Sequence, residues 1–532
     1  MSGRHPTGDE DGTEKATRRR FLELSAAASG ALAAGCSSGS TDRGAGAAAP
    51  TSTERPARPE TVRTENQRPG DPHWRIRHRG APQAIEGYAD RVSVLPGEAF
   101  GLHVSTTAGG FRVCAYRMGW YAGSRARLVW RSAHTPGTRQ RAPRVEGSTR
   151  TVHADWDRSL SVPTRGWPEG SYLLRLDADG GEGQRYVPLT VRSATTAGRT
   201  VIINAAATWQ AYNRWGGYSL YDGPDGASRS RSLTVTFDRP YDKDGAEKFL
   251  VYELPAIALA ERLGIPLAHA TGVDVATRPG LLDGATTVVT LGHDEYWTPQ
   301  RRARTAHARD VGTNLALLGA NTCFRRIRLE PSATGAHRMV VCYKSAYRED
   351  PRYPRSPALV TNDYRREPAP DPESALTGVL YEGYPAEAPY VVTRPDHWAF
   401  QGTGVHAGDS FAHLVGIEYD RVTPSAPTPR PIEIVAHSPL VWNGSPSHSD
   451  TAYYTAPSGA GVFATGTMRW VESLDATGRS VQGVRHGFDA RTGAFTTRTT
   501  ENILRAFASG PAARTHPASD NLHQVYRSAP SR

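Results

Sequence analysis

The sequence predicts a multidomain chain that combines β and α/β structure, with an antiparallel β-sandwich followed by a doubly wound α/β domain. Between residues 71 and 195 the chain consists of short runs in which apolar and polar residues alternate, the pattern of half-buried antiparallel strands. After residue 199 continuous apolar runs alternate with helical segments, as in a parallel sheet covered by helices on both faces. A length of 532 residues fits two or three domains.

The first 36 residues are predicted to be an export signal. Residues 17–22, Thr-Arg-Arg-Arg-Phe-Leu, match the twin-arginine pattern, and the weakly apolar residues 24–34 that follow are fewer than the roughly 20 that a membrane span requires. The signal ends in Leu-Ala-Ala-Gly-Cys36, which resembles a bacterial lipobox; a plain cleavage site with an incidental cysteine is the alternative. We therefore expect a lipoprotein tethered through Cys36 to the extracellular side of the cell membrane.

Domain boundaries follow from changes in composition. Residues 37–70 are rich in Ser, Gly, Ala, Pro and Thr and poor in large apolar residues, so we expect a disordered linker there. The β-sandwich is expected over residues 71–195, the α/β domain over residues 199–515, and a tail over residues 516–532.

Charge bears on the partners of the protein. The 63 Lys and Arg residues exceed the 53 Asp and Glu residues, for a formal net charge of +10. Arg is spread along the chain among acidic residues rather than gathered into a phosphate-binding patch, so we expect no nucleic-acid partner. The oligomeric state stays open, a homo-oligomer included. Only four residues are lysine, namely Lys15, Lys243, Lys248 and Lys344, so each lysine calls for a specific reason.

Three cysteines follow Cys36. In an oxidising exterior Cys323 and Cys342 could form a disulfide, which would stabilise the fold by about 3 kcal/mol. Cys114 lies in an alternating run and is expected to be a small buried apolar residue. The spacing of these cysteines fits no zinc site.

The first folded domain is expected to be an Ig-like sandwich, because about seven runs alternate with period two and show no helical period. The clearest runs are residues 91–98, 99–105, 111–118, 128–130, 172–176 and 186–192. Trp120 and Tyr121 follow one of these runs and are expected to be exposed, which would suit carbohydrate binding.

In the second domain, buried parallel strands are expected at residues 200–205, 286–292 and 313–319, and a helix around residues 254–263. Thr298 followed by Pro299 is typical of a helix start, and this helix is expected to run to about Asp310. Doubly wound sheets form their sites beyond the carboxyl ends of the strands. The polar residues that follow these strands are therefore the candidates for chemistry.

Polar and aromatic motifs follow all three strands. The first strand runs into Trp209-Gln-Ala-Tyr212-Asn and Ser-Leu-Tyr221-Asp, the second into His293-Asp-Glu295-Tyr-Trp, and the third into Gly-Ala-Asn321-Thr. With Tyr-Arg-Met-Gly-Trp-Tyr-Ala-Gly at residues 116–123 and Phe-Asp-Arg-Pro-Tyr at residues 237–241, the chain resembles the N,N-dimethylformamidase large (beta) subunit family over about residues 80 to 510. Each motif alone is weak, and their combination is specific.

This resemblance implies a glutamine-amidotransferase-like α/β domain behind the β-sandwich, and a mononuclear ferric centre, Fe(III), that hydrolyses a small amide substrate. The implied metal ligands are Tyr212, Tyr221 and Glu295; the first ligand could instead fall at Trp209, where iron binding would fail. The implied catalytic residues are His293, Asn321 and Lys344.

The residue types suit that chemistry. Two phenolates and one carboxylate neutralise Fe(III) with hard oxygen donors, and a phenolate at neutral pH needs such a cation because the pKa of Tyr is about 10. The ion would act as a Lewis acid on an amide carbonyl. His293 could accept a proton from water, and Asn321 and Lys344 could donate hydrogen bonds to the developing oxyanion.

Each of these residues also has a structural explanation. Tyr212 and Tyr221 could be buried aromatic residues, Glu295 and His293 could cap the helix at Thr298, Asn321 could occupy a left-handed turn, and Lys344 could pair with an acid on the surface. Further polar candidates are His397, Trp398, Glu418, Tyr419 and Asp420.

Two other functions remain open. Cys323 could serve as the nucleophile of a cysteine amidotransferase or peptidase, although it lies two positions beyond Asn321. The chain could also be a non-catalytic cell-surface or carbohydrate-binding lipoprotein, which would bind no metal.

Overall fold

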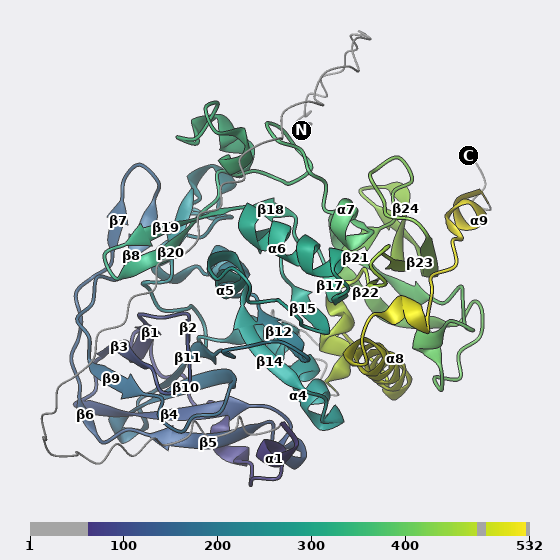
Figure 1. The fold of residues 1–532 in the computed structure, drawn as a ribbon. Coiled ribbons are helices and arrows are strands. Elements are labelled where there is room, and N and C mark those ends of the chain that lie inside the picture. Colours follow the sequence, from purple (N-terminus) through teal and green to yellow (C-terminus); the bar gives the residue numbers. More distant parts are fainter. Residues whose placement is uncertain (1–61, 476–485, 528–532) are drawn as a thin grey trace, which may run out of the picture. The chain divides into compact units, whose positions relative to one another are not determined.

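A computed structural model describes residues 62–475 and 486–527 (Figure 1). The chain is multidomain and mostly β-sheet with some helices, as predicted in outline. The proposed signal and Cys36 lie outside the described residues. No helix within the described ranges is long and apolar enough to cross a membrane.

The N-terminal part is built from two sheets that share one apolar core. A three-stranded sheet has the order β1 (Ile85–Ala89), β3 (Ala99–Thr106) and β9 (Leu160–Pro163). A six-stranded sheet runs β2 (Ser93–Val94), β11 (Gln184–Val191), β10 (Gly170–Ala178), β4 (Gly110–Met118) and β5 (Ala126–Arg131), with β6 (Thr135–Pro136) beside β4. Leu102 and Val104 of the first sheet pack with Val113 and Leu174 of the second. A hairpin of β7 (Arg144–Glu146) and β8 (Thr151–His153) follows β6 in the chain.

A seven-stranded sheet forms the centre of the C-terminal part. Its order is β14 (Leu267–Thr271), β12 (Thr200–Asn204), β15 (Thr287–His293), β17 (Asn314–Ala320), β25 (Gly461–Ala464), β24 (Ser445–Thr455) and β23 (Ile432–Trp442). The first five strands are parallel, and β24 and β23 are antiparallel. Ile202 packs into one core, whereas its neighbours Val201 and Ile203 pack into the other. Burial on both faces explains why these strands are apolar without alternation.

Helices cover both faces of this sheet. They include α4 (Leu254–Leu263), α5 (Gly272–Thr277), α6 (Pro299–Asp310) and α8 (Ala490–Ala508). Residues of α4 and α8 join one core and residues of α5 and α6 join the other, on opposite sides of β12 and β15 in Figure 1. The predicted helix start is confirmed, because the Thr298 side chain accepts a hydrogen bond from the Arg301 backbone N–H and Pro299 is the first helical residue.

Smaller elements complete the fold. They comprise a sheet of β13 (Thr234–Thr236), β20 (Gly335–Val341) and β19 (Arg328–Ser332), the pairs β16 (Tyr296–Trp297) with β18 (Arg325–Arg326) and β21 (Leu380–Val391) with β22 (Ser410–Arg421), and the short helices α1 (Val62–Asn66), α2 (Ala206–Tyr212), α3 (Glu247–Tyr252), α7 (Ser374–Thr377) and α9 (Leu522–Arg527). Helix α1 lies inside the range expected to be a linker. Residues 62–66 of that range are therefore helical, and residues 37–61 lie outside the described residues.

A buried ion pair joins the two parts of the chain. Arg117 of β4 donates both terminal nitrogens to the carboxylate of Glu261 in α4, with the longer contact at 3.0 Å. Tyr121, expected to be exposed, is instead buried, and its hydroxyl donates to Glu65 of α1 at 2.6 Å. Trp120 is partly exposed. The Arg117 to Tyr121 segment therefore packs at the junction, which removes one support for a carbohydrate-binding surface.

The expected disulfide is absent. Cys323 and Cys342 are both buried free thiols in different apolar cores. Arg302 donates a hydrogen bond to the Cys323 sulfur at 3.4 Å. A disulfide between these two thiols was possible from the sequence, but they lie in separate apolar cores. Cys114 is a buried residue of β4, as predicted.

Candidate metal centre

The ends of three parallel strands bring the predicted site residues together. Strands β12, β15 and β17 are neighbours, so the residues that follow them meet at one edge of the sheet (Figure 1). Helix α2 follows β12 and ends at Tyr212, β15 ends at His293, and Asn321 follows β17. Paired glycines in β15 and β17 allow this approach. A Cβ on Gly319 would lie 2.0 Å from the backbone oxygen of Gly292.

Three oxygen-bearing side chains converge at this edge. The Tyr212 hydroxyl donates to Glu295 Oε2 at 2.8 Å, and the Tyr221 hydroxyl lies 2.7 Å from the same oxygen. The two hydroxyl oxygens are 2.7 Å apart. The backbone of Glu295 is also anchored, because its N–H donates to the Thr208 hydroxyl at 3.1 Å. All three residues that the sequence suggested as metal ligands are thus in mutual contact.

Histidine and a second carboxylate adjoin this cluster. His293 Nε2 lies 3.4 Å from Glu295 Oε2 and 3.4 Å from Glu418 Oε2. Asn321 Nδ2 donates to Glu418 at 2.7 Å, and the Asn321 backbone N–H donates to Asp420 at 2.8 Å. The structure thus places Glu418, until now only one of several polar candidates, against both His293 and Asn321. Glu418 is far from His293 and Asn321 in the sequence, so the sequence did not indicate that it contacts them.

Two further residues that the sequence did not single out complete the surroundings of Glu295. The hydroxyl of Tyr296 donates to Tyr221 at 2.9 Å. Arg325 Nε donates to Glu295 Oε1 at 3.1 Å, and the same guanidinium pairs with Asp363. Arginine is so frequent in this chain that Arg325 carried no signal in the sequence.

Two of the four lysines lie over the two phenol rings. Lys344 Nζ is 3.3 Å from the ring centre of Tyr221, and Lys248 Nζ is 4.0 Å from the ring centre of Tyr212. A cation over an aromatic face is attracted by the ring, and it also favours the anionic form of a phenol. Lys344 is buried, so it is not the surface ion pair that was its alternative explanation. The rarity of lysine was a signal that could have pointed to Lys248 as well.

Trp209 does not reach the oxygen cluster. Its indole N–H donates to the buried carboxylate of Glu253 at 2.8 Å. Its ring packs edge-on against Tyr241 and Phe249. The hydroxyl at the cluster therefore comes from Tyr212.

The charges of the cluster shift the pKa values of its members. Burial by itself would raise the pKa of Glu295, but the hydrogen bond from His293 and the charges of Arg325 and Lys344 outweigh it and hold that pKa well below its usual range. Burial likewise disfavours charged His293, yet Glu418 and Glu295 raise its pKa to about 9. Removal from water and the charge of Glu295 raise the pKa of Tyr212 and Tyr221 well above 10.

The contacts of His293, Glu295 and Asn321 test the alternative explanations of helix capping and a left-handed turn. The α6 helix is capped by Thr298, while the intervening Asp294 pairs with Arg301. Glu295 and His293 therefore do not serve as its cap. Asn321 does adopt the left-handed conformation, with φ at 58°, and in addition holds Glu418.

The other candidates lie apart from the oxygen cluster. Burial raises the pKa of the Cys323 thiol to about 11, the opposite of what a thiolate nucleophile needs. His397 and Trp398 pack among the aromatic rings of Tyr453 and Phe463. The Tyr419 hydroxyl donates to Ser447 at 2.9 Å.

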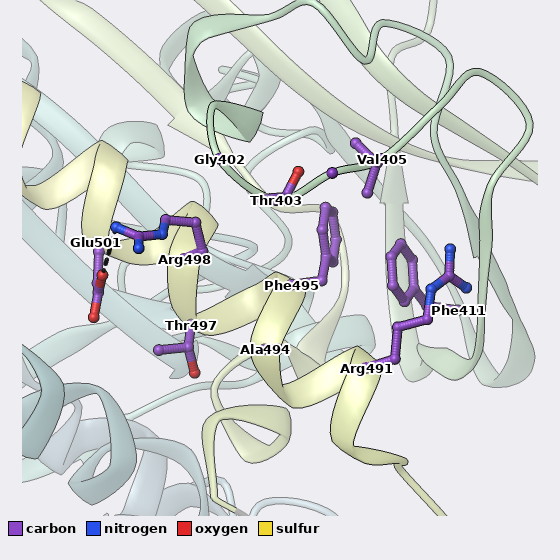
Figure 2. A pocket seen from close by; sticks show the side chains of 11 residues that line it. Gly402, Thr403, Val405, Phe411, Arg491, Ala494, Phe495, Thr497, Arg498 and Glu501 are labelled. Carbon is purple, nitrogen blue, oxygen red and sulfur yellow. Dashed lines mark ion pairs between the residues drawn. The ribbon is translucent and has the colours of Figure 1, made fainter.

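Two cavities differ in their position relative to the oxygen cluster. One of about 190 Å³ is lined by Tyr212, Trp209 and Lys248. Another of about 370 Å³ lies between α8 and the loop at residues 402–405 (Figure 2), where Phe411 and Phe495 stack and Arg498 pairs with Glu501. None of the predicted site residues lines this second cavity.

Conventional metal donors are too few for a metal site within the described ranges. No group of three or more His, Cys, Asp or Glu residues there could hold a metal ion. A metal at the oxygen cluster would thus depend on the phenolic oxygens of Tyr212 and Tyr221.

Comparison with known proteins agrees with the motifs around this site. The family model described as N,N-dimethylformamidase beta subunit-like, C-terminal, matches residues 112–486, which is more than half of the chain and includes every residue of the oxygen cluster. A search of curated proteins found no match. The chain therefore belongs to the N,N-dimethylformamidase beta subunit-like, C-terminal family.

Proposed function

We propose that this protein is an iron-dependent hydrolase of amide C–N bonds, with Fe(III) held by Tyr212, Tyr221 and Glu295. The observation that carries the proposal is the convergence of the two phenolic oxygens on Glu295 Oε2, at 2.8 and 2.7 Å. Membership of the dimethylformamidase-like family supports the reaction class. We also propose that the two N-terminal sheets form an Ig-like β-sandwich and that the seven-stranded sheet is glutamine-amidotransferase-like.

The residues present fit a trivalent cation. Two phenolates and one carboxylate would supply three negative charges on hard oxygens, which suits Fe(III). The phenolic protons are held only within the cluster and can be displaced by a cation, since a strong positive charge lowers the pKa of an adjacent acid. Lys344 and Lys248 face the phenol rings and favour the phenolate form.

When bound, the ferric ion would polarise the amide carbonyl and activate water. His293, placed between Glu295 and Glu418, holds a proton at neutral pH because these carboxylates raise its pKa to about 9, and it is positioned to donate that proton to the departing amine. Glu418 stabilises the charged imidazole, and Asn321 holds Glu418 in place. Lys344 is positioned as a cationic donor for the developing oxyanion.

Metal analysis and visible spectroscopy of the purified protein test the proposal. We expect about one iron per chain and a phenolate-to-iron charge-transfer band. Tyr221→Phe and Glu295→Gln should each lose the band and the amidase activity. Tyr390→Phe is the matched control, because Tyr390 is a buried tyrosine whose ring packs against Trp470 and Phe495, not against the oxygen cluster. A colourless protein that takes up no added iron would overturn the assignment.

We further propose that the protein is exported by the twin-arginine route and tethered to the membrane surface through lipidated Cys36. The Thr-Arg-Arg-Arg-Phe-Leu motif and the lipobox-like Leu-Ala-Ala-Gly-Cys36 support this localisation. Replacement of both Arg18 and Arg19 by Lys should leave the protein inside the cell, whereas Cys36→Ala should release it from the membrane fraction. Retention of the Cys36→Ala protein on membranes would contradict the anchor.

A further inference from the structure

The cavity beside Tyr212 has an apolar wall and one side chain without a polar partner. Its apolar lining includes Trp209, Tyr241 and Phe249, and its volume of about 190 Å³ admits a small organic group. Lys248 of α3 also lines it. The cavity thus adjoins the oxygen cluster through the phenol ring of Tyr212.

The four other charged side chains that line this cavity, Arg214, Asp242, Lys243 and Glu247, have partners. Lys243 pairs with Glu247, and Arg214 lies 3.3 Å from Asp222. Asp242 accepts a hydrogen bond from the Arg214 backbone N–H at 3.2 Å.

Lys248, in contrast to these charged side chains, has no polar partner in the described structure. Within the described part of the chain its ammonium makes no hydrogen bond or ion pair, and its contacts are the rings of Tyr212 at 4.0 Å and Tyr252 at 5.9 Å. Glu247 and Asp242 line the same cavity, but both have other partners and neither forms an ion pair with Lys248 in the described structure. A partly buried cation without a direct anionic partner is costly, because it loses water without gaining a paired counter-charge. An anionic ligand in the cavity would supply that counter-charge.

We propose that this cavity receives a carboxylate group of the amide substrate, which pairs with Lys248. The inference rests on the proposed amidase function and narrows its substrate class to amides that carry a carboxylate a few bonds from the scissile C–N bond. A single ammonium suits a monoanion, whereas a phosphate dianion typically recruits arginine or several donors. The aromatic wall accommodates the short apolar part of such a substrate.

Equilibrium binding to the purified full-length protein tests this pairing without depending on turnover. The probes are N-acetylglycine and its neutral analogue N-acetylglycinamide, measured by calorimetry. We expect the native protein to bind the carboxylate probe at least about tenfold more tightly, which is the usual effect of one charge-assisted hydrogen bond. Lys248→Met should abolish this preference, and Lys248→Arg should keep most of it.

Lys243→Met provides the matched control, because Lys243 lines the same cavity and already pairs with Glu247. This variant should keep the preference for the carboxylate probe. Equal affinity of the native protein for both probes, binding of neither probe, or an undiminished preference in Lys248→Met would overturn the proposal. If iron is absent but the preference depends on Lys248, the metal assignment fails and the carboxylate site stands.

Discussion

At the scale of single residues, the oxygen cluster is defined by the contacts that meet on Glu295. Glu295 is the focus of two hydroxyls, an imidazole and a guanidinium, and no single one of these contacts identifies a metal site. Their coincidence on one buried carboxylate is the observation that supports the proposed iron site. The same reasoning separates Tyr212, whose hydroxyl joins the cluster, from Trp209, whose indole N–H serves Glu253.

Because Tyr212 and Trp209 have different hydrogen-bond partners, their variants should differ in iron content and in stability. Tyr212→Phe removes a phenolic oxygen and should reduce bound iron to a small fraction of the native level, with little change in unfolding. Trp209→Phe should retain iron, but it leaves Glu253 short of a donor and should lower the free energy of unfolding by about 1 to 3 kcal/mol. Iron content and denaturant unfolding of both variants check this. Loss of iron in Trp209→Phe with native content in Tyr212→Phe would reverse the assignment.

A second residue-scale prediction concerns pH and Asp420. Burial raises the pKa of Asp420 to about 8, above the 3.8 of an unperturbed aspartate. Between these two values the folded chain binds the proton more tightly than the unfolded chain, so Asp420 makes stability fall as pH rises from about 4 to about 8. One proton contributes a slope of at most about 1.4 kcal/mol per pH unit.

Asp420→Asn should flatten this pH dependence, because the amide oxygen can still accept the hydrogen bond from the Asn321 backbone N–H. Urea unfolding of both proteins at intervals from pH 5 to pH 8 provides the measurement. An equally steep decline in the variant would show that other groups cause it.

At the scale of elements, capping residues set where a helix begins, and packing against the sheet sets the direction of the helix. Helix α6 starts at Pro299 because Thr298 accepts the Arg301 backbone N–H, and it ends at Asp310 as its sequence predicts. Only five residues separate β15 from this helix, and two of them form the short strand β16, which pairs with β18. This short connection places Glu295 and Tyr296 at the site.

Removal of the cap should therefore affect stability more than chemistry. Thr298→Ala is expected to lower the free energy of unfolding by about 1 kcal/mol, while iron content and the charge-transfer band stay native. Thr298→Ser, which keeps the accepting oxygen, should be close to native in both respects. Loss of iron in Thr298→Ala would show that the cap also holds the metal ligands in place.

At the scale of the whole molecule, a buried ion pair couples the two-sheet N-terminal part to the parallel sheet. Arg117 and Glu261 are both almost fully buried, and Tyr121 donates to Glu65 beside them. The motif at residues 116–123 that supported the family resemblance thus lies at this junction. Its Arg117 and Tyr121 side chains contact Glu261 and Glu65 there.

Breaking one side of this pair should be costly. Arg117→Met leaves Glu261 buried without a counter-charge and is expected to lower the free energy of unfolding by about 3 to 5 kcal/mol. The double variant with Glu261→Met should lose less than the sum of the two single variants. Arg141→Met, in the exposed pair with Asp157, is the control and should change stability by less than about 1 kcal/mol. Additive losses in the double variant would contradict the coupling.

The sequence by itself determined the buried parallel strands and the start of α6, and it placed Tyr212, Tyr221 and Glu295 in segments that follow neighbouring strands. Apolar runs and helix caps are local patterns, and parallel strands place their carboxyl ends at one edge, so these features can be inferred without coordinates. The family resemblance then selected among the polar residues at that edge.

Only the tertiary structure decided that Glu418 reaches His293, that Lys248 lies over Tyr212, and that Cys323 and Cys342 enter separate cores. These contacts join segments that are far apart in the chain or diverge across the sheet, and no local pattern encodes them. Their energies depend on burial and on the distances between charges, and both quantities exist only once the elements have packed.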